Sequence, residues 1–324
     1  MTYTAPLSSI GDDLQHVEAA LLQVAPPDYP ELGGIFRNLV EAGGKRIRPA
    51  LVLLAARFND YDLNNLLHGA VAVELLHTAS LVHDDTIDQA AIRRGRPTVN
   101  TFLPDSAAIL IGDYIFAQSA ISSATPGNAQ VVYVFANTLR EICDGELRQA
   151  LGNHRLSFNR EEYFRRIHAK TAALFACSAE IGALLSNAPD NHRRALRLYG
   201  EKLGQAYQVI DDILDFSASP AQFGKPVGED LLHGTATLPT IIYLEELAEG
   251  DENARTVLDA LRGMDGADHT RALSLVRESG ALTRAHHEAG KLADEARAAL
   301  LELPPGEDRN ALHDLAAYVL DRDR

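Results

Sequence analysis

Positive charge is scarce in this sequence. Its 324 residues include 30 Lys and Arg against 45 Asp and Glu, which gives a formal net charge of −15. A nucleic-acid-binding protein would present a basic face, so the composition argues against that class. The same deficit means that an anionic substrate must be attracted locally, by a cluster of basic side chains or by a metal ion.

Cysteines and long apolar runs are scarce as well. Cys143 and Cys177 match no metal-site spacing and are too few for a disulfide framework, so we expect two buried thiols in a reducing compartment and a cytoplasmic protein. The opening MTYTAPLSSIGDD lacks the basic and apolar regions of a signal peptide. The richest apolar stretch, 70–82, is interrupted by Glu74 and His77, so we expect no transmembrane segment.

Alternating strand patterns are also missing, and apolar residues recur at helical spacing almost throughout. Helices are predicted up to the prolines at 26 and 27 and then at 49–58, 64–88, 105–123, 130–151, 160–186 and 190–217, with shorter helices after these. The stretch 218–234 is rich in Gly and Pro and is predicted to be a functional loop. With no repeat and no linker, the pattern predicts a single all-α domain over residues 1–324.

The long third helix ends in the acidic motif HDDTID, residues 83–88. Residues four apart on a helix lie about 40° apart around its axis, so Asp84 and Asp88 share one face while Asp85 points aside. Two carboxylates at this spacing can chelate a hard cation. A solvated acidic helix end is the competing interpretation, although carboxylates there oppose the helix macrodipole.

The same spacing recurs in DDILD, residues 211–215, again near a predicted helix end and again after an apolar run. Two such motifs are hard to explain as solvated faces. If they face one another, they could hold several Mg²⁺ ions between them. Mg²⁺ completes its shell with waters and substrate phosphates, so a diphosphate ester is the natural substrate.

Basic residues gather in a few places. GGKRIRP, residues 43–49, sets three cations beside two glycines at a helix start, which suits a phosphate, although a solvated basic loop is the simpler interpretation. RRGRP, residues 93–97, follows the first acidic motif. Lys170 and Thr171 lie within an apolar helix, and Lys225 lies in the Gly- and Pro-rich stretch.

Seven stretches in a fixed order carry a resemblance to a known family: GGKRIRP, ELLHTASLVHDDTID, RRGRPT, GDYIFAQS, AKTAALF, YQVIDDILD, and FGKPVGEDL ending in TLP. Over essentially its whole length the chain resembles the trans-prenyl (polyprenyl) diphosphate synthases, in particular their medium- and long-chain members. The resemblance implies a single-domain antiparallel helical bundle around a central cavity, the isoprenoid synthase fold. It also implies a homodimer that uses Mg²⁺, with three ions per active site.

The resemblance assigns site residues by function. It assigns Lys45, Arg48, His77 and Arg94 to the diphosphate of isopentenyl diphosphate; Arg93, Lys170, Thr171, Gln208 and Lys225 to the allylic diphosphate; and Asp84, Asp88, Asp211 and Asp215 to Mg²⁺, with Asp215 supporting beside Asp212. Within these sets it makes Asp84, Asp88, Asp211, Lys170 and Lys225 the catalytic residues. In one departure, Thr235 stands where the family often has a Lys, and long-chain members also tend to lack that Lys.

The implied mechanism needs no nucleophilic side chain. Metal ions and basic residues draw charge onto the allylic diphosphate, its C–O bond ionises, isopentenyl diphosphate attacks the allylic cation, and a proton is lost. The departing diphosphate is the expected base. The cation requires an apolar pocket that excludes water, and the long third helix is expected to form one wall of it.

The resemblance implies that product length depends on bulk at the fourth and fifth positions before the first aspartate motif. These residues are Ser80 and Ala79, both small, so the upper cavity should be open. Its floor should then lie lower, near Leu75, Leu76 or Ala72, or on a facing helix such as 109–116. We therefore predict a product beyond farnesyl and beyond geranylgeranyl diphosphate, and Ala79→Phe should shorten it. Small side chains at a helix–helix contact are the competing interpretation for Ser80 and Ala79.

Four alternatives stay open at this point. A geranylgeranyl diphosphate synthase is one, because Leu76 and Phe116 could stop chain growth early. A class I terpene cyclase would share the metal-triggered ionisation but would lack an isopentenyl diphosphate site, against which GGKRIRP counts. An inactive partner subunit of a heteromeric synthase would have lost motif members, whereas this chain retains nearly all of them. A plain helical scaffold would not place two DDxxD motifs above apolar walls.

Overall fold

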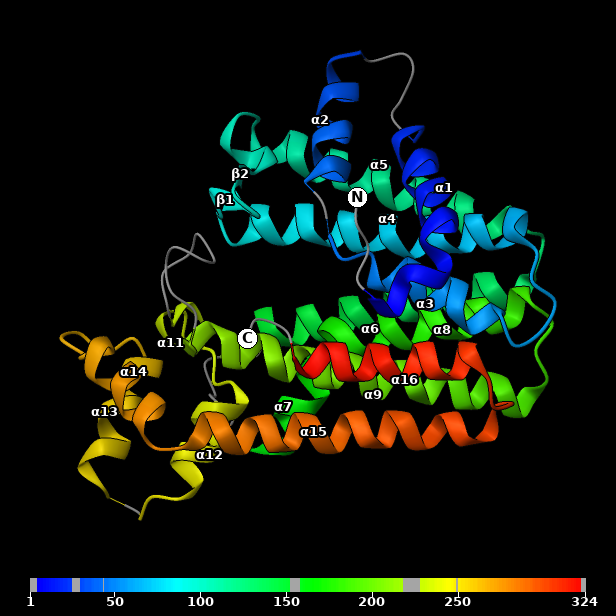
Figure 1. Cartoon of the computed structure of the whole chain (residues 1–324). Coiled ribbons are helices and arrows are strands. Elements are labelled where there is room, and N and C mark those ends of the chain that lie inside the picture. The colour runs from blue at the N-terminus through cyan, green and yellow to red at the C-terminus, as the bar shows by residue number, and fades with distance from the viewer. Residues whose placement is uncertain are drawn as a thin grey trace. The chain divides into compact units, whose positions relative to one another are not determined.

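The computed structural model describes residues 5–24, 30–42, 44–151, 158–217, 228–248 and 250–321. Helices dominate these residues, which confirms the all-α prediction (Figure 1). The chain divides into two compact units. The first comprises Met1–Arg140, Leu174–Gly200 and Arg297–Leu315, and the second Glu141–Ala173, Glu201–Ala296 and Ala316–Arg324.

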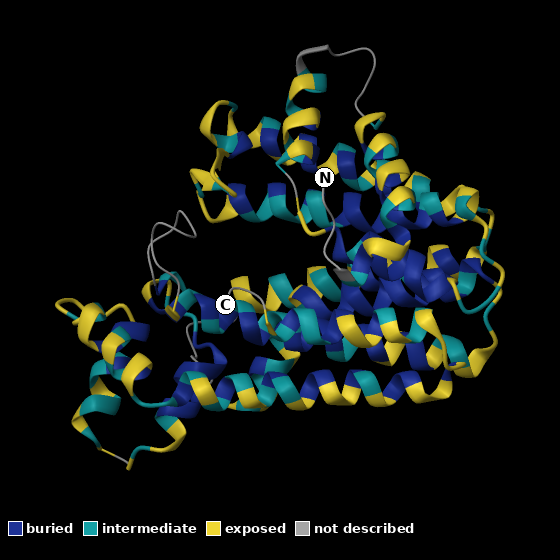
Figure 2. Ribbon diagram, in the orientation of Figure 1, coloured by how far each residue is buried: buried dark blue, intermediate teal, exposed yellow. Residues whose placement is uncertain are grey.

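The first unit is built around a buried helix. Its elements are η1 (Ala5–Ile10), α1 (Gly11–Leu22), α2 (Pro30–Glu41), α3 (Ile47–Ala56), α4 (Leu63–Ile87), β1 (Ile92–Arg93), β2 (Arg96–Pro97), η2 (Val99–Thr101), α5 (Asp105–Ala124), most of α8 (Ala173–Leu185), η4 (Leu300–Glu302) and parts of α6 (Ala129–Leu151), α9 (Asp190–Ser217) and α16 (Glu307–Leu320). Every residue of α3 except Arg48 is buried (Figure 2). A side chain at Gly182 of α8 would come within 2.2 Å of the Val52 carbonyl oxygen, so glycine allows α8 to approach α3 closely.

Helices α4 and α5 pack along each other. His83 contacts α5 from the end of α4 that carries the first acidic motif. His83 Nε2 lies 3.0 Å from the carbonyl oxygen of Ile109, and its ring packs against Phe116. The imidazole occupies the place of a side chain at Gly112, where a Cβ atom would lie 2.2 Å from Nε2. The residue before Asp84 is thereby held against α5.

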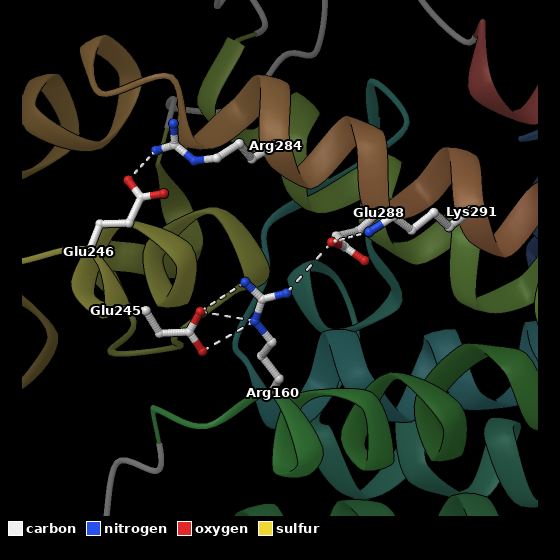
Figure 3. A network of polar contacts seen from close by, with 6 residues as sticks. All are labelled: Arg160, Glu245, Glu246, Arg284, Glu288 and Lys291. Atoms are coloured by element: carbon white, nitrogen blue, oxygen red, sulfur yellow. Dashed lines mark hydrogen bonds and ion pairs between the residues drawn. The ribbon is translucent and has the colours of Figure 1, made fainter.

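The second unit contains α7 (Arg160–Ile167), a π-helical turn η3 (His168–Ala172), most of α9, α11 (Glu229–Leu232), α12 (Leu238–Glu245), α13 (Glu252–Leu261), α14 (His269–Glu278) and most of α15 (Ala281–Ala299). Exposed ion pairs join the ends of α7 and α12 to α15 (Figure 3). Arg160 lies between Glu245, at 2.8 Å, and Glu288, at 3.7 Å, and Arg284 binds Glu246 at 2.5 Å. Exposed pairs of this kind contribute about 1 kcal/mol or less each, so they add little to stability.

Several boundaries differ from the predictions. Helix α4 is capped by Asp62, which accepts a hydrogen bond from Asn64 N, and not by an asparagine at 64 or 65. A short β-hairpin replaces the loop expected at 95–97, and α2 and the π-helical turn were not predicted. Cys177 is buried as expected, but Cys143 is exposed on α6, so that expectation was wrong.

Two helices, α4 and α5, are long and apolar enough to span a bilayer by length and composition alone. The apolar window of α4 is 61% buried inside the protein and that of α5 is 33% buried. The mostly buried window of α4 is that of a core helix, and α4 also carries the first aspartate motif.

Candidate active site

The basic turn before α3 directs its three cations differently. Lys45 is exposed, Arg46 is buried, and Arg48 is half-buried, with its guanidinium carbon 4.9 Å from the centroid of the Phe175 ring on α8. Two of the three cations are therefore partly accessible to a ligand. Gly43, just before this turn, lies outside the described residues.

A cavity of about 520 Å³ opens in the first unit between α2, α4 and the β-hairpin. Its polar lining includes His77, Asp85, Arg93, Arg94 and Arg96, and its apolar lining includes Ile35, Leu39, Leu81, Val99 and Phe102. Burial and the positive charges of Arg48 and Arg94 lower the pKa of His77 well below its usual range, so this imidazole is neutral. The structure thus brings the predicted His77, Arg93 and Arg94 to one cavity.

The first acidic motif separates into two kinds of carboxylate. Asp84 is half-buried and Asp88 is exposed just past the last residue of α4, whereas Asp85 is 7% exposed. Arg93 donates to Asp85 Oδ1 from Nε at 2.8 Å and from Nη2 at 2.5 Å. Asp85 thus points aside as predicted, and it holds an arginine that was assigned to the allylic diphosphate.

In the second unit, a chain of hydrogen bonds joins the π-helical turn to the second acidic motif. Thr171 Oγ1 donates to Gln208 Oε1 at 2.6 Å, and Gln208 Nε2 donates to Asp212 Oδ1 at 2.9 Å. Tyr163 on α7 donates to the other oxygen of Asp212 at 2.6 Å. Thr171 is buried while the preceding Lys170 is exposed, so the turn presents the lysine and anchors itself through the threonine.

Burial also marks the carboxylates of this motif. Burial and the nearby charge of Asp230 raise the pKa of Asp212 to about 7 and that of Asp215 to about 6. Asp212 is buried, whereas Asp211 and Asp215 are half-buried. Asp215 accepts hydrogen bonds from the backbone N–H groups of Glu229 and Asp230, both at 3.2 Å, and so caps α11. Lys225 lies outside the described residues.

The donor set fits Mg²⁺ of the kind that binds together with substrate. Among the described residues, no three His, Cys, Asp or Glu side chains gather into a group that could hold a metal ion. Mg²⁺ needs only one or two carboxylates when phosphate oxygens and waters complete its shell. The half-buried Asp84 with the exposed Asp88, and Asp211 in the second unit, meet that requirement.

The three predicted chain-length residues differ in their surroundings. Ser80 is half-buried and donates to the carbonyl oxygen of His77 at 2.8 Å within its own helix. It lies one turn before Asp84 and shares its face, whereas Ala79 lies about 140° away around the axis. Ala79 and Leu76 are both fully buried, at 0% exposure.

Sequence reasoning missed the roles of two residues, Arg46 in the first unit and Tyr163 in the second. Arg46 appeared equivalent to Lys45 and Arg48, yet its guanidinium is buried among carboxylates. Tyr163 is a buried tyrosine in a charged helix, and only its aromatic character amid EEYFRR set it apart. Neither role follows from local spacing, since the partners lie 28 and 49 residues away along the chain.

Comparison with known proteins places this site in a family. The family model described as polyprenyl synthetase matches residues 29–278. The chain is 41% identical over 324 residues to the heptaprenyl diphosphate synthase component 2 of Geobacillus stearothermophilus, with 100% of both chains covered.

Solved structures of polyprenyl synthases are similar to this chain over nearly its whole length. A decaprenyl diphosphate synthase from Rhodobacter capsulatus is 35% identical, with a TM-score of 0.90 and 98% of each chain covered. A polyprenyl synthase from Caulobacter crescentus CB15, complexed with calcium and isoprenyl diphosphate, is 31% identical, with a TM-score of 0.91 over 98% of this chain and 97% of that one.

An all-α architecture with two aspartate motifs near helix ends and a cationic cavity is that of a metal-dependent prenyltransferase of the isoprenoid synthase fold. The chain belongs to the polyprenyl synthetase family and is a polyprenyl diphosphate synthase.

Proposed function

We propose that the protein condenses isopentenyl diphosphate with an allylic prenyl diphosphate and releases a product longer than geranylgeranyl diphosphate. The observation that carries this proposal is the cationic cavity beside the first aspartate motif. A second diphosphate site next to a metal motif suits a condensing enzyme, whereas a terpene cyclase binds a single diphosphate. Relatives named heptaprenyl and decaprenyl diphosphate synthase support a medium-to-long product.

In this proposal the first unit binds isopentenyl diphosphate. Lys45, Arg48 and Arg94 hold the diphosphate of isopentenyl diphosphate through charge-assisted hydrogen bonds. Neutral His77 donates or accepts a hydrogen bond without adding charge, because burial and the surrounding arginines keep its pKa low.

The allylic diphosphate is assigned to Arg93, Lys170, Thr171, Gln208 and Lys225. Lys170 is exposed on the π-helical turn and supplies a cation, while Thr171 and Gln208 fix the orientation of that turn. These groups stabilise the charge that develops on the leaving diphosphate as the C–O bond breaks. Isopentenyl diphosphate then attacks the allylic cation, and the departing diphosphate is positioned to accept the proton.

Asp84, Asp88 and Asp211 are the proposed Mg²⁺ ligands, with Asp215 in support and three ions per active site. When bound, Mg²⁺ would neutralise the allylic diphosphate and make it a leaving group. Support for a divalent cation comes from the donor set and from a neighbour complexed with calcium and isoprenyl diphosphate. Turnover in the presence of excess chelator would overturn this assignment.

We propose that the 324 residues act as one cytoplasmic synthase domain and that two copies associate through α5. That helix exposes apolar side chains on one face, with Ile109, Leu110 and Ile121 at 46, 66 and 59% exposure. Burial of such a patch against a second copy removes apolar surface from water. A relative named component 2 makes a different partner chain the competing possibility.

The test combines mass and turnover. Light scattering should give twice the chain mass, and Leu110→Glu should give a monomer. The purified chain alone should elongate an allylic primer with labelled isopentenyl diphosphate. A chain that stays monomeric and turns over only after a second protein is added would refute the homodimer. A product that stops at geranylgeranyl diphosphate would support the shorter-chain alternative.

A further inference from the structure

Arg46 lies between the two cations that are assigned to isopentenyl diphosphate, yet it points into the protein. It is 4% exposed, whereas Lys45 before it is exposed and Arg48 after it is half-buried. Its side chain also lines the cavity that contains His77 and Arg94. An arginine in the middle of a substrate-binding turn thus contributes no charge to the solvent side of that turn.

Three helices supply the partners of its guanidinium. Glu18 of α1 accepts from Nε at 2.5 Å and from Nη2 at 3.1 Å, and Glu74 of α4 accepts from Nη1 at 2.6 Å. The carbonyl oxygen of Val40 in α2 accepts from Nη2 at 2.7 Å. The planar fork of an arginine suits this set of acceptors, and the point charge of a lysine does not. The turn is thereby tied to α1, α2 and α4 at once.

The backbone at Arg46 is in a conformation that residues other than glycine rarely adopt. Its φ of 48° and ψ of 34° are left-handed, and its carbonyl oxygen accepts the hydrogen bond from Ala50 N that begins α3. A left-handed residue with a Cβ persists when its surroundings hold it there. Here the ion pairs with Glu18 and Glu74 supply that restraint. They stabilise the change of chain direction at Arg46, which sets the directions of Lys45 and Arg48.

We propose that Arg46 is a positioning residue of the isopentenyl diphosphate site. Each nitrogen of its guanidinium already donates to Glu18, Glu74 or Val40, so it acts through these contacts, which hold the turn that presents Lys45 and Arg48. Glu74 lies one turn before His77 on α4, so the same ion pair ties the turn to the helix that carries the histidine. This inference rests on the proposed function, which makes the turn a diphosphate site.

A purely structural role predicts different behaviour. Loss of Arg46 leaves two carboxylates, one of them deeply buried, without their partner, and any such change lowers stability. Melting temperature alone is therefore uninformative. The separating variant is Arg46→Met combined with Glu18→Gln and Glu74→Gln, because it removes the buried charges together and should regain stability without regaining the restraint on the turn.

The experiment measures melting temperature and the KM of each substrate, at a temperature well below every transition. Arg46→Met and the triple variant should raise the KM for isopentenyl diphosphate roughly ten- to a hundredfold, as expected for displaced binding groups. The KM for the allylic substrate should stay within about twofold. Arg46→Lys should rescue the KM only in part, since it keeps the charge but loses the fork.

Two controls make the result decisive. Leu54→Ala removes a fully buried side chain of α3 and lowers stability without touching the ion pairs, so its KM values should stay at the wild-type level. If the Arg46 variants fail to fold, Glu18→Gln removes one partly exposed partner, and a severalfold rise in the KM for isopentenyl diphosphate is expected.

Two outcomes overturn the inference. One is a triple variant that regains stability together with a wild-type KM for isopentenyl diphosphate. The other is a KM that rises equally in Leu54→Ala. Lys45→Ala separates failure of this inference from failure of the proposed function. If Lys45→Ala raises that KM and the Arg46 variants do not, only the positioning role is wrong; if Lys45→Ala has no effect, the assigned diphosphate site is wrong as well.

Discussion

Replacement of Ser80 by phenylalanine should shorten the product. Ser80 lies four residues before Asp84 on the same face of α4, about 6 Å along the axis at 1.5 Å per residue. Two residues lie deeper on this face, each about 20° from Asp84 around the axis: His77, three residues before Ser80 and a further ~4.5 Å, and Val73, seven residues before it and a further ~10.5 Å. One helical turn of ~5.4 Å is comparable with an extended isoprene unit, so an aromatic ring at position 80 should remove about two units of depth.

The structure makes Ser80→Phe a cleaner variant than Ala79→Phe. The Ser80 hydroxyl is bonded within its own helix, and the residue is half-buried, so a larger side chain has room on that face. Ala79 is fully buried, and a phenylalanine there would overpack the core at a cost of about 1–3 kcal/mol. Any shortening by Ala79→Phe should therefore come with a lower melting temperature.

The assay extends an allylic primer with labelled isopentenyl diphosphate and sizes the products. Ser80→Phe should move the main product to farnesyl or geranylgeranyl diphosphate, with condensation retained and the melting temperature nearly unchanged. Ser274→Phe makes the same substitution at an exposed position on α14 and should leave the distribution as in the wild type. An unchanged distribution in Ser80→Phe would show that this face of α4 does not limit chain growth.

Three further predictions follow from the site. Asp84→Ala or Asp211→Ala should abolish turnover while circular dichroism stays that of the wild type; turnover near the wild-type rate in either variant argues against the metal assignment. Arg48→Ala should mainly raise the KM for isopentenyl diphosphate and Lys170→Ala that for the allylic substrate, each by about 1.5–3 kcal/mol, or roughly ten- to a hundredfold. The lowered pKa of His77 means that only the unfolded chain binds its proton just below pH 6.5, so stability falls as the pH drops through that region. His77→Gln should make the melting temperature less sensitive between about pH 7 and 5, and an equally steep or steeper dependence would contradict the neutral histidine.

Local patterns in the sequence were sufficient to predict much of the helical layout. Helix α9 was predicted with the boundaries it has, Asp190–Ser217, because Pro189 and the Gly- and Pro-rich stretch after it mark both ends. Helix α4 and the sideways direction of Asp85 followed from the period of 3.6 residues. Helix α2 was missed because Gly33 and Gly34 interrupt its pattern, although the apolar residues after them, at 35, 36, 39 and 40, recur at helical spacing.

The details of the site depended on contacts that local patterns do not contain. The inward direction of Arg46 is set by Glu18 and Glu74, each 28 residues away along the chain. The hydrogen bond between Tyr163 and Asp212 spans 49 residues, and it explains why Asp212 is buried between the more accessible Asp211 and Asp215. Spacing identifies which residues share a helix face, but not which of them find a partner across the fold.

The most direct test of the account is one incubation of the purified chain with labelled isopentenyl diphosphate and an allylic primer, with Mg²⁺ and with excess chelator. With Mg²⁺ we expect several additions of isopentenyl diphosphate and a linear diphosphate longer than geranylgeranyl diphosphate, and with chelator no product. A hydrocarbon formed from the primer alone, or label incorporated equally in both conditions, would contradict the account.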